Sequence, residues 1–189
     1  VNMVKHLFNG NKDTCGNLTS GGTESILMAC KTYRDWARDN KNITKPEIVV
    51  GESVHGSFLK AGDYFNIKIV TVPVEGSSGK TCIKSMANKI NKNTVCIVGS
   101  APSFAHGVID NIKEMSDLAL KHNIGLHVDC CLGGFILPFI KQTGLCDYEF
   151  DFQLPGVTSI SVDSHKYGNS MKGSSIILYK NKKLRKYQY

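Results

Sequence analysis

Apolar positions along the chain follow two rhythms that alternate from one end to the other. Short, nearly continuous apolar runs predict buried strands at residues 47–51, 67–74, 94–100, 124–129, 157–163 and 174–180. Between them, apolar residues recur at helical spacing, which predicts amphipathic helices at residues 22–40, 55–65, 81–90 and 111–123. In the first of these helices, the apolar residues that share one face are Ile26, Ala29, Cys30, Tyr33 and Ala37.

Strands that alternate with helices predict an α/β fold. We expect a three-layer sandwich in which helices cover both faces of a mostly parallel sheet. The 189 residues are enough for one domain with a real hydrophobic core. Ligands of such sheets bind beyond the carboxyl ends of the strands. The loops after residues 50, 100, 128 and 162 should therefore share one edge of the sheet, where a site is expected.

The composition narrows the class of protein. Apolar residues make up 41% and charged residues 21% of the chain, as in ordinary globular proteins. No window approaches the roughly 18 apolar residues of a membrane span, and the first residues, VNMVKHLFNG, lack a starting methionine and the pattern of a secretory signal. The seven cysteines form no C-x-x-C pair, so we expect reduced core thiols in a cytosol-facing protein and no metal site.

The net charge leaves one further possibility open. The formal charge is +7, and part of it lies in the segment YKNKKLRKYQY, residues 179–189. A basic, aromatic segment could bind nucleic acid or an anionic membrane surface. Because the other basic residues are dispersed, a solvated or packed segment is the simpler interpretation, and we expect no nucleic-acid partner.

A glycine-rich stretch, LTSGGTES at residues 18–25, precedes the first predicted helix. Glycines let an anion approach the backbone, and a helix N-terminus offers free N–H groups and partial positive charge. The stretch therefore predicts a phosphate cradle. It matches neither the nucleotide P-loop nor the dinucleotide fingerprint. An ordinary helix start, capped by Ser20 or Thr23, is the competing interpretation.

Two ionisable residues fall at the ends of predicted strands. Asp129 ends the strand in LHVDCC, where a buried carboxylate needs a positive partner or caps the following loop. Lys166 follows the strand in SISVDSHKYG, where burial should lower its pKa and give a neutral amine that attacks a carbonyl. An ordinary surface lysine is the alternative.

A histidine completes this set. His55 begins the second predicted helix, just beyond a strand end, where it either caps the helix or stacks on a ligand ring. A phosphate loop, a carboxylate and a lysine are together the contacts that pyridoxal 5′-phosphate requires. The lysine forms a Schiff base, the carboxylate keeps the pyridine nitrogen protonated, and the loop holds the phosphate.

The amino-acid sequences of these stretches resemble those of a known family. TSGGTESILMA (19–29), FAHGVID (104–110), LHVDCCLGGFILPF (126–139) and GVTSISVDSHKYG (156–168) are similar to the group II decarboxylases among the fold-type I pyridoxal-phosphate enzymes. Within that family they most resemble the sphingosine-1-phosphate lyase branch. The chain departs from this branch at Cys130, Ser164 and Ala105, and in NSM at residues 169–171.

The resemblance implies roles for individual residues. Lys166 would carry the Schiff base, Asp129 would bind the pyridinium nitrogen, and His55 would stack over the ring, so these three are the expected catalytic residues. The remaining cofactor contacts implied in this way are Gly22, Thr23, Ser103, Cys131 and His165.

The resemblance also implies an activity and a setting. It implies an aldehyde-lyase that cleaves the C2–C3 bond of phosphorylated sphingoid bases into a long-chain aldehyde and ethanolamine phosphate. Residues 1–189 would be its cofactor-binding large domain, without an N-terminal segment and a C-terminal small domain. The full-length enzyme would be a homodimer that contacts the endoplasmic reticulum membrane through a segment outside this chain. The alternatives are an amino-acid decarboxylase of the same family and an inactive truncated fragment.

Overall fold

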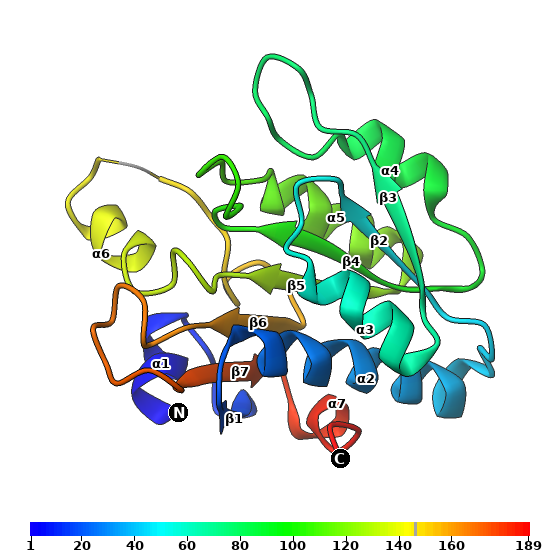
Figure 1. The fold of residues 1–189 in the computed structure, drawn as a ribbon, viewed down its shortest axis with the longest axis horizontal. Helices are drawn as coiled ribbons and strands as arrows, with labels where there is room; N and C mark the ends of the chain where they lie inside the picture. Colours follow the sequence, from blue (N-terminus) through cyan, green and yellow to red (C-terminus); the bar gives the residue numbers. More distant parts are fainter. Residues whose placement is uncertain (146) are drawn as a thin grey trace.

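The computed structural model describes residues 1–145 and 147–189, and Cys146 lies outside the described part (Figure 1). Seven strands form one sheet, and their bounds are β1 Cys15–Thr19, β2 Glu47–Gly51, β3 Lys68–Val72, β4 Thr94–Ser100, β5 Gly125–Asp129, β6 Ser159–Val162 and β7 Ser175–Tyr179. The helices are α1 Asn2–Leu7, α2 Gly22–Lys41, α3 Ser57–Phe65, α4 Ile83–Lys89, α5 Ile112–His122, α6 Leu137–Gln142 and α7 Lys182–Arg185.

The sheet is mostly parallel, as expected. Its strand order is β1-β7-β6-β5-β4-β2-β3. The pairs β2–β3, β2–β4, β4–β5 and β5–β6 are parallel, whereas β7 runs antiparallel to both β6 and β1. All strands except β7 therefore point the same way, and their carboxyl ends share one edge of the sheet (Figure 1).

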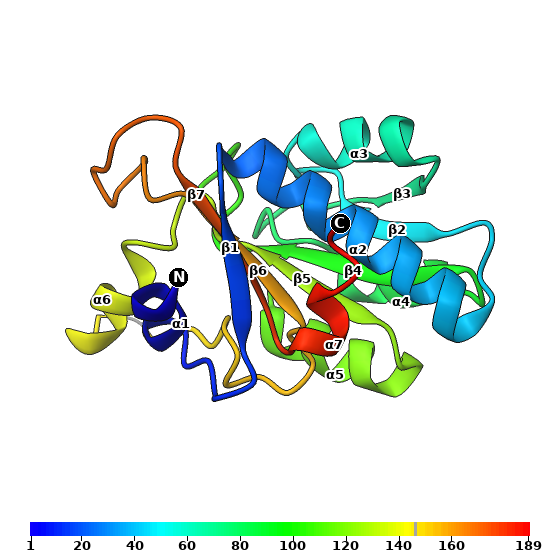
Figure 2. The same cartoon turned by 90° about the horizontal axis from the view of Figure 1, so that it is seen from below.

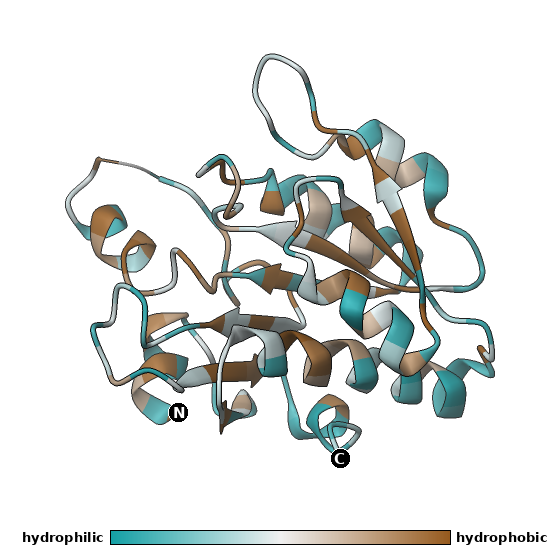
Figure 3. Cartoon of the chain, in the orientation of Figure 1, coloured by the Kyte–Doolittle hydropathy of each residue, from teal (hydrophilic) through white to brown (hydrophobic). Residues whose placement is uncertain are grey.

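Helices cover both faces of the sheet, which confirms the three-layer arrangement (Figure 2). On one face, α2 and α3 pack on Ile48, Val50 and Ile177. On the other face, α4 and α5 pack on the intervening strand residues, such as Val49 and Ile97. Figure 3 shows the result as largely hydrophobic central strands between helices that carry both kinds of residue. This alternation is what a strand buried on both faces requires.

Several elements do not follow from the apolar pattern. β1, α1, α6 and α7 are absent from the sequence-based expectation, and each is short. β1 has the sequence CGNLT, which carries little hydrophobic signal, and it forms because it pairs with β7 at the edge of the sheet. The cysteines described are unpaired, and Cys30, Cys96, Cys130 and Cys131 are buried, in line with the expected core thiols.

Candidate active site

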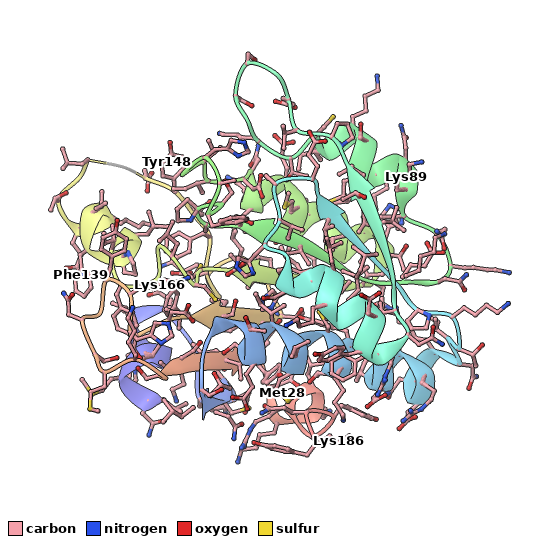
Figure 4. The ribbon with its side chains drawn as sticks, viewed as in Figure 1. Met28, Lys89, Phe139, Tyr148, Lys166 and Lys186 are labelled. Atoms are coloured by element: carbon pink, nitrogen blue, oxygen red, sulfur yellow. The ribbon has the colours of Figure 1, made fainter. Side chains whose placement is uncertain are left out.

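One cavity of about 410 Å³ opens at the carboxyl edge of the sheet. It lies within the size range of small-molecule sites. Of the residues predicted from sequence, it is lined by Gly22, Thr23, His55, Asp129, Cys131, His165 and Lys166. The loops after β2, β4, β5 and β6 and the start of α2 thus converge, as the strand-end rule predicts. Figure 4 labels Lys166 beyond the end of β6.

The glycine-rich stretch leaves the start of α2 open. The N-cap is Gly21, in an extended conformation, and its cap position makes no side-chain hydrogen bond. Ser20 donates its N–H and its hydroxyl to Glu24 Oε2, at 2.6 Å each, while Thr23 Oγ1 lies 3.0 Å from Ser57 Oγ. The expected alternative of a Ser20 or Thr23 cap is therefore wrong. The free N–H groups at this end face the cavity that Gly21, Gly22 and Thr23 line, which suits an anion.

Position 22 requires glycine because the α2 backbone there lies very close to the side chains of Asp163 and Cys131. A Cβ at position 22 would stand 2.8 Å from Asp163 Oδ2 and 2.8 Å from Cys131 Sγ. These distances are too short for any real carbon contact, and both partners are buried. The absence of a side chain therefore brings the α2 backbone against the ends of β5 and β6, and any substitution would push the cradle away from them.

Lys166 forms an ion pair with Asp163, a residue for which the sequence predicted no role. Its Nζ lies 3.0 Å from Asp163 Oδ2, and the Asp163 side chain is only 3% exposed against 34% for Lys166. Partial burial lowers the pKa of Lys166, but the hydrogen bond and the charge of Asp163 outweigh burial and leave this pKa above its ordinary value. The expectation of an amine made neutral by burial is therefore wrong, because the carboxylate stabilises the ammonium form.

Asp163 carries further contacts at the same place. His165 Nε2 lies 3.7 Å from Asp163 Oδ2, and Asp163 Oδ1 is buried without a hydrogen-bond partner among the described residues. A buried carboxylate oxygen without a donor is costly, and such atoms are frequent at functional sites. Asp163 directly precedes Ser-His-Lys at a strand end, so the strand-end rule could have identified it.

Asp129 combines the two roles considered for it. It is 7% exposed and lies in the sheet between Ser100 of β4 and Ser161 of β6. Its Oδ1 accepts the Cys131 N–H at 3.0 Å and the Ser161 hydroxyl at 3.3 Å. The carboxylate thus caps the following loop through one oxygen and at the same time lines the cavity.

His55 likewise serves the helix start and the cavity. Its Nδ1 accepts the Ser57 N–H at 3.2 Å and lies 2.8 Å from Ser57 Oγ. The Phe104 ring packs edge-on against it, with ring centroids 5.0 Å apart. These contacts fix the plane of the imidazole at the cavity wall. Phe104 also lines the cavity and was not among the expected site residues.

Of the three remaining predicted residues, His165 and Cys131 line the cavity and Ser103 does not. His165 Nδ1 accepts the Ser174 N–H at 3.1 Å, which directs the other ring nitrogen toward Asp163. Burial, followed by the charges of Asp129 and Asp163, raises the pKa of Cys131, so that it stays a thiol. Ser103 is buried, but it does not line the cavity, and only its neighbours Pro102 and Phe104 do.

The described part of the chain holds neither a metal cluster nor a membrane-spanning helix. Within residues 1–145 and 147–189, no group of three or more His, Cys, Asp or Glu side chains is arranged to hold a metal ion. In the same residues, every helix is too short or too polar to cross a membrane.

The family follows from a comparison with known proteins. Residues 1–187 match the pyridoxal-dependent decarboxylase conserved domain. The chain belongs to the pyridoxal-dependent decarboxylase family. This result confirms the fold class and the cofactor that the sequence predicts, pyridoxal 5′-phosphate. The residues around the cavity fit that cofactor, because they present an open helix N-terminus, a lysine and a buried carboxylate in one space.

Named relatives point to one branch of the family. The chain is 49% identical over its whole length to a sphingosine-1-phosphate lyase of Drosophila melanogaster and 52% identical to sphingosine-1-phosphate lyase 1 of Rattus norvegicus. It covers 35% and 33% of these proteins, so it spans about a third of their length.

The fold agrees with this branch. A solved Burkholderia pseudomallei sphingosine-1-phosphate lyase superposes with a TM-score of 0.96 at 37% identity, covering 99% of this chain and 45% of that one. A Lactobacillus brevis glutamate decarboxylase superposes with a TM-score of 0.87 at 23% identity, covering 97% of this chain and 44% of that one, which shows the shared fold alone.

Proposed function

We propose that the whole protein is an aldehyde-lyase that cleaves the C2–C3 bond of phosphorylated sphingoid bases. The observation that carries the proposal is the similarity to sphingosine-1-phosphate lyases at 49–52% identity across the entire chain. The cavity supports it, because it collects the amine and the carboxylate that the chemistry needs.

Lys166 is the residue that would hold the cofactor covalently through its aldehyde carbon. When bound, pyridoxal 5′-phosphate supplies an electron sink for a carbanion. Lys166 must lose its proton before its amine can attack a carbonyl, and the nearest acceptor is Asp163 Oδ2, at 3.0 Å. We therefore assign Asp163 the task of holding this amine in place and balancing its charge until the proton leaves.

The other residues would hold the cofactor at its remaining edges. Asp129 would meet the pyridine nitrogen and keep it protonated. The N–H groups at Gly22 and Thr23, with the His165 ring, would hold the phosphate. His55 would cover one face of the ring, and Cys131, whose Sγ lies close to the α2 backbone at Gly22, would lie under the other.

The reaction would proceed at two carbons of the substrate. The substrate would bind with its C2 amine at the position of the Lys166 amine. The net reaction would remove the C3 hydroxyl proton, break the C2–C3 bond to give a long-chain aldehyde, and add a proton to C2. Lys166 would then take back its place at the cofactor as ethanolamine phosphate leaves. Phe104, which is 56% exposed at the cavity, offers an apolar surface for a long chain.

The setting of the whole protein is proposed on the same basis. We infer a homodimer in which a neighbouring subunit completes the cavity. We also infer that the cofactor domain faces the cytosol at the endoplasmic reticulum, with membrane contact through a segment outside residues 1–189. Both inferences depend on the resemblance to the lyase branch.

Products separate the candidate activities. The whole protein, loaded with pyridoxal 5′-phosphate, is incubated with sphingosine phosphate and, separately, with amino acids. Release of a long-chain aldehyde from sphingosine phosphate supports the proposal. Release of carbon dioxide from an amino acid, with no aldehyde, identifies a decarboxylase instead. The absence of both products in a cofactor-bound protein identifies an inactive relative.

A further inference from the structure

A line of buried polar side chains runs beneath Asp129, on the α2-facing side of β5 and β6. Its members are Tyr33, Ser159, His127 and Ser161, and each is at most 2% exposed. The links are Tyr33 hydroxyl to Ser159 Oγ at 2.5 Å, His127 Nδ1 to Ser159 Oγ at 2.7 Å and His127 Nε2 to Ser161 Oγ at 3.1 Å. The last and longest link joins Ser161 to Asp129 Oδ1 at 3.3 Å.

Hydrogen-bond chemistry fixes the direction of this line. An ionised carboxylate only accepts, so Ser161 donates its single hydroxyl proton to Asp129. Ser161 Oγ must then accept from His127 Nε2–H, which leaves Nδ1 of a neutral ring to accept from the Ser159 hydroxyl. Ser159 in turn accepts from Tyr33. Every donor along the line therefore points toward Asp129.

Burial keeps the line in this one protonation pattern. Burial lowers the pKa of His127 to about 4, so its ring is neutral near pH 7. Burial also raises the pKa of the Tyr33 hydroxyl well above its ordinary value, so Tyr33 stays a donor.

Local packing holds the line in register. The Tyr33 ring reaches Ser159 because Gly125 has no side chain, and a Cβ there would stand 2.3 Å from Tyr33 Cε1. The Phe58 ring packs edge-on against His127, with centroids 5.8 Å apart.

We propose that His127 is a positioning residue for Asp129. It acts through Ser161, whose hydroxyl donates to Asp129 Oδ1, to hold the carboxylate in a fixed orientation toward the ring nitrogen of the cofactor. This inference rests on the proposed function, in which Asp129 meets that nitrogen. Donors directed at a carboxylate fix its orientation, and a carboxylate held against a pyridine nitrogen is what keeps that nitrogen protonated. His127 itself does not line the cavity.

A purely structural role makes a different prediction. If the line only satisfies buried polar groups, its loss disturbs the cavity for any ligand of the same shape. If it acts through Asp129 on the ring nitrogen, its loss matters only to a ligand that has this nitrogen. The 1-deaza analogue of pyridoxal 5′-phosphate, with C–H in place of the ring nitrogen, distinguishes the two.

The experiment measures the affinity of the whole protein for both ligands by their absorption on binding. His127→Phe keeps a ring of similar size but removes both hydrogen bonds, whereas His127→Gln keeps a donor for Ser161. We expect His127→Phe to weaken the binding of pyridoxal 5′-phosphate about fivefold more than the binding of the deaza analogue, as for a lost hydrogen bond between neutral groups. We expect His127→Gln to recover most of this difference.

Controls keep the outcome interpretable. Phe58→Leu changes the packing on His127 without breaking the line, and it should affect both ligands equally. If His127→Phe does not fold, Ser161→Ala removes the donor to Asp129 and should show the same selectivity for the nitrogen-containing ligand. If His127→Phe lost the same affinity for both ligands, or lost none, the inference about His127 would be overturned while the proposed function would stand. A wild-type protein that binds neither ligand would overturn the proposed function as well.

Discussion

Lys166 and Asp163 meet at the end of β6 as an ion pair in which one partner is buried and the other half-exposed. The lysine is identifiable from sequence because it follows an apolar strand beside a histidine. Its protonation state is not, because that depends on the 3.0 Å contact with Asp163 and on how far each side chain is buried. A lysine at a strand end thus predicts a site, while its charge follows from the folded geometry.

Replacement of Asp163 tests this dependence. Asp163→Asn removes the charge that stabilises the ammonium form, so we expect the pKa of Lys166 to fall and its amine to react faster near pH 7. The pH dependence of Lys166 labelling by an amine-reactive reagent, followed by peptide mass spectrometry, measures this change in cofactor-free protein. Asp151→Asn is a matched control, because Asp151 is a buried carboxylate bonded to Asn9, outside the residues that line the cavity. Unchanged Lys166 reactivity in Asp163→Asn would contradict the assignment.

At the scale of elements, the periodic helices and the apolar strands could be predicted from sequence. The spacing of apolar residues within each segment indicates which of its positions are buried. The β5 and β6 strands show where this reasoning stops. SISV has the alternation of an ordinary strand, yet its serines face α2 and bind His127 rather than water. That arrangement depends on β5 lying beside β6 and on Tyr33 of α2, which sequence patterns do not place.

Helix ends follow a simpler local rule. α2, α3 and α5 each end at an asparagine in the left-handed region, at Asn42, Asn66 and Asn123. Asparagine tolerates this conformation better than other residues with a side chain, and glycine tolerates it best. These positions could have marked the helix ends from sequence.

Asn66 offers a test, because its φ of 53° is strained for alanine and its side chain is exposed. We expect Asn66→Ala to lower the free energy of unfolding by about 1 kcal/mol and Asn66→Gly to leave it nearly unchanged. Urea unfolding compares the two variants directly. Equal stability in both would show that the left-handed conformation carries no cost at this position.

For the molecule as a whole, folding is coupled to pH through His127. Its pKa is about 4 when folded, against 6.5 for an unperturbed histidine, because burial disfavours the charged ring. Between these values the unfolded chain binds a proton that the folded chain does not, so stability falls as the pH drops from 6.5 toward 4. The stabilisation is present above pH 6.5.

Unfolding at two pH values measures this coupling. Between pH 7 and pH 5, the wild type should lose about 2 kcal/mol more of its free energy of unfolding than His127→Gln, which has no titrating ring. His106→Gln, at an exposed histidine, should lose as much as the wild type. Parallel losses in wild type and His127→Gln would mean that His127 is not buried as a neutral group.

The central claim is that one cavity at the carboxyl edge of the sheet holds pyridoxal 5′-phosphate through Lys166. Borohydride reduction of the loaded whole protein, followed by peptide mass spectrometry, identifies the lysine that carries the cofactor. We predict one modified residue, Lys166, and no modified peptide in Lys166→Ala. A cofactor fixed to a different lysine, with Lys166 unmodified, would contradict the claim.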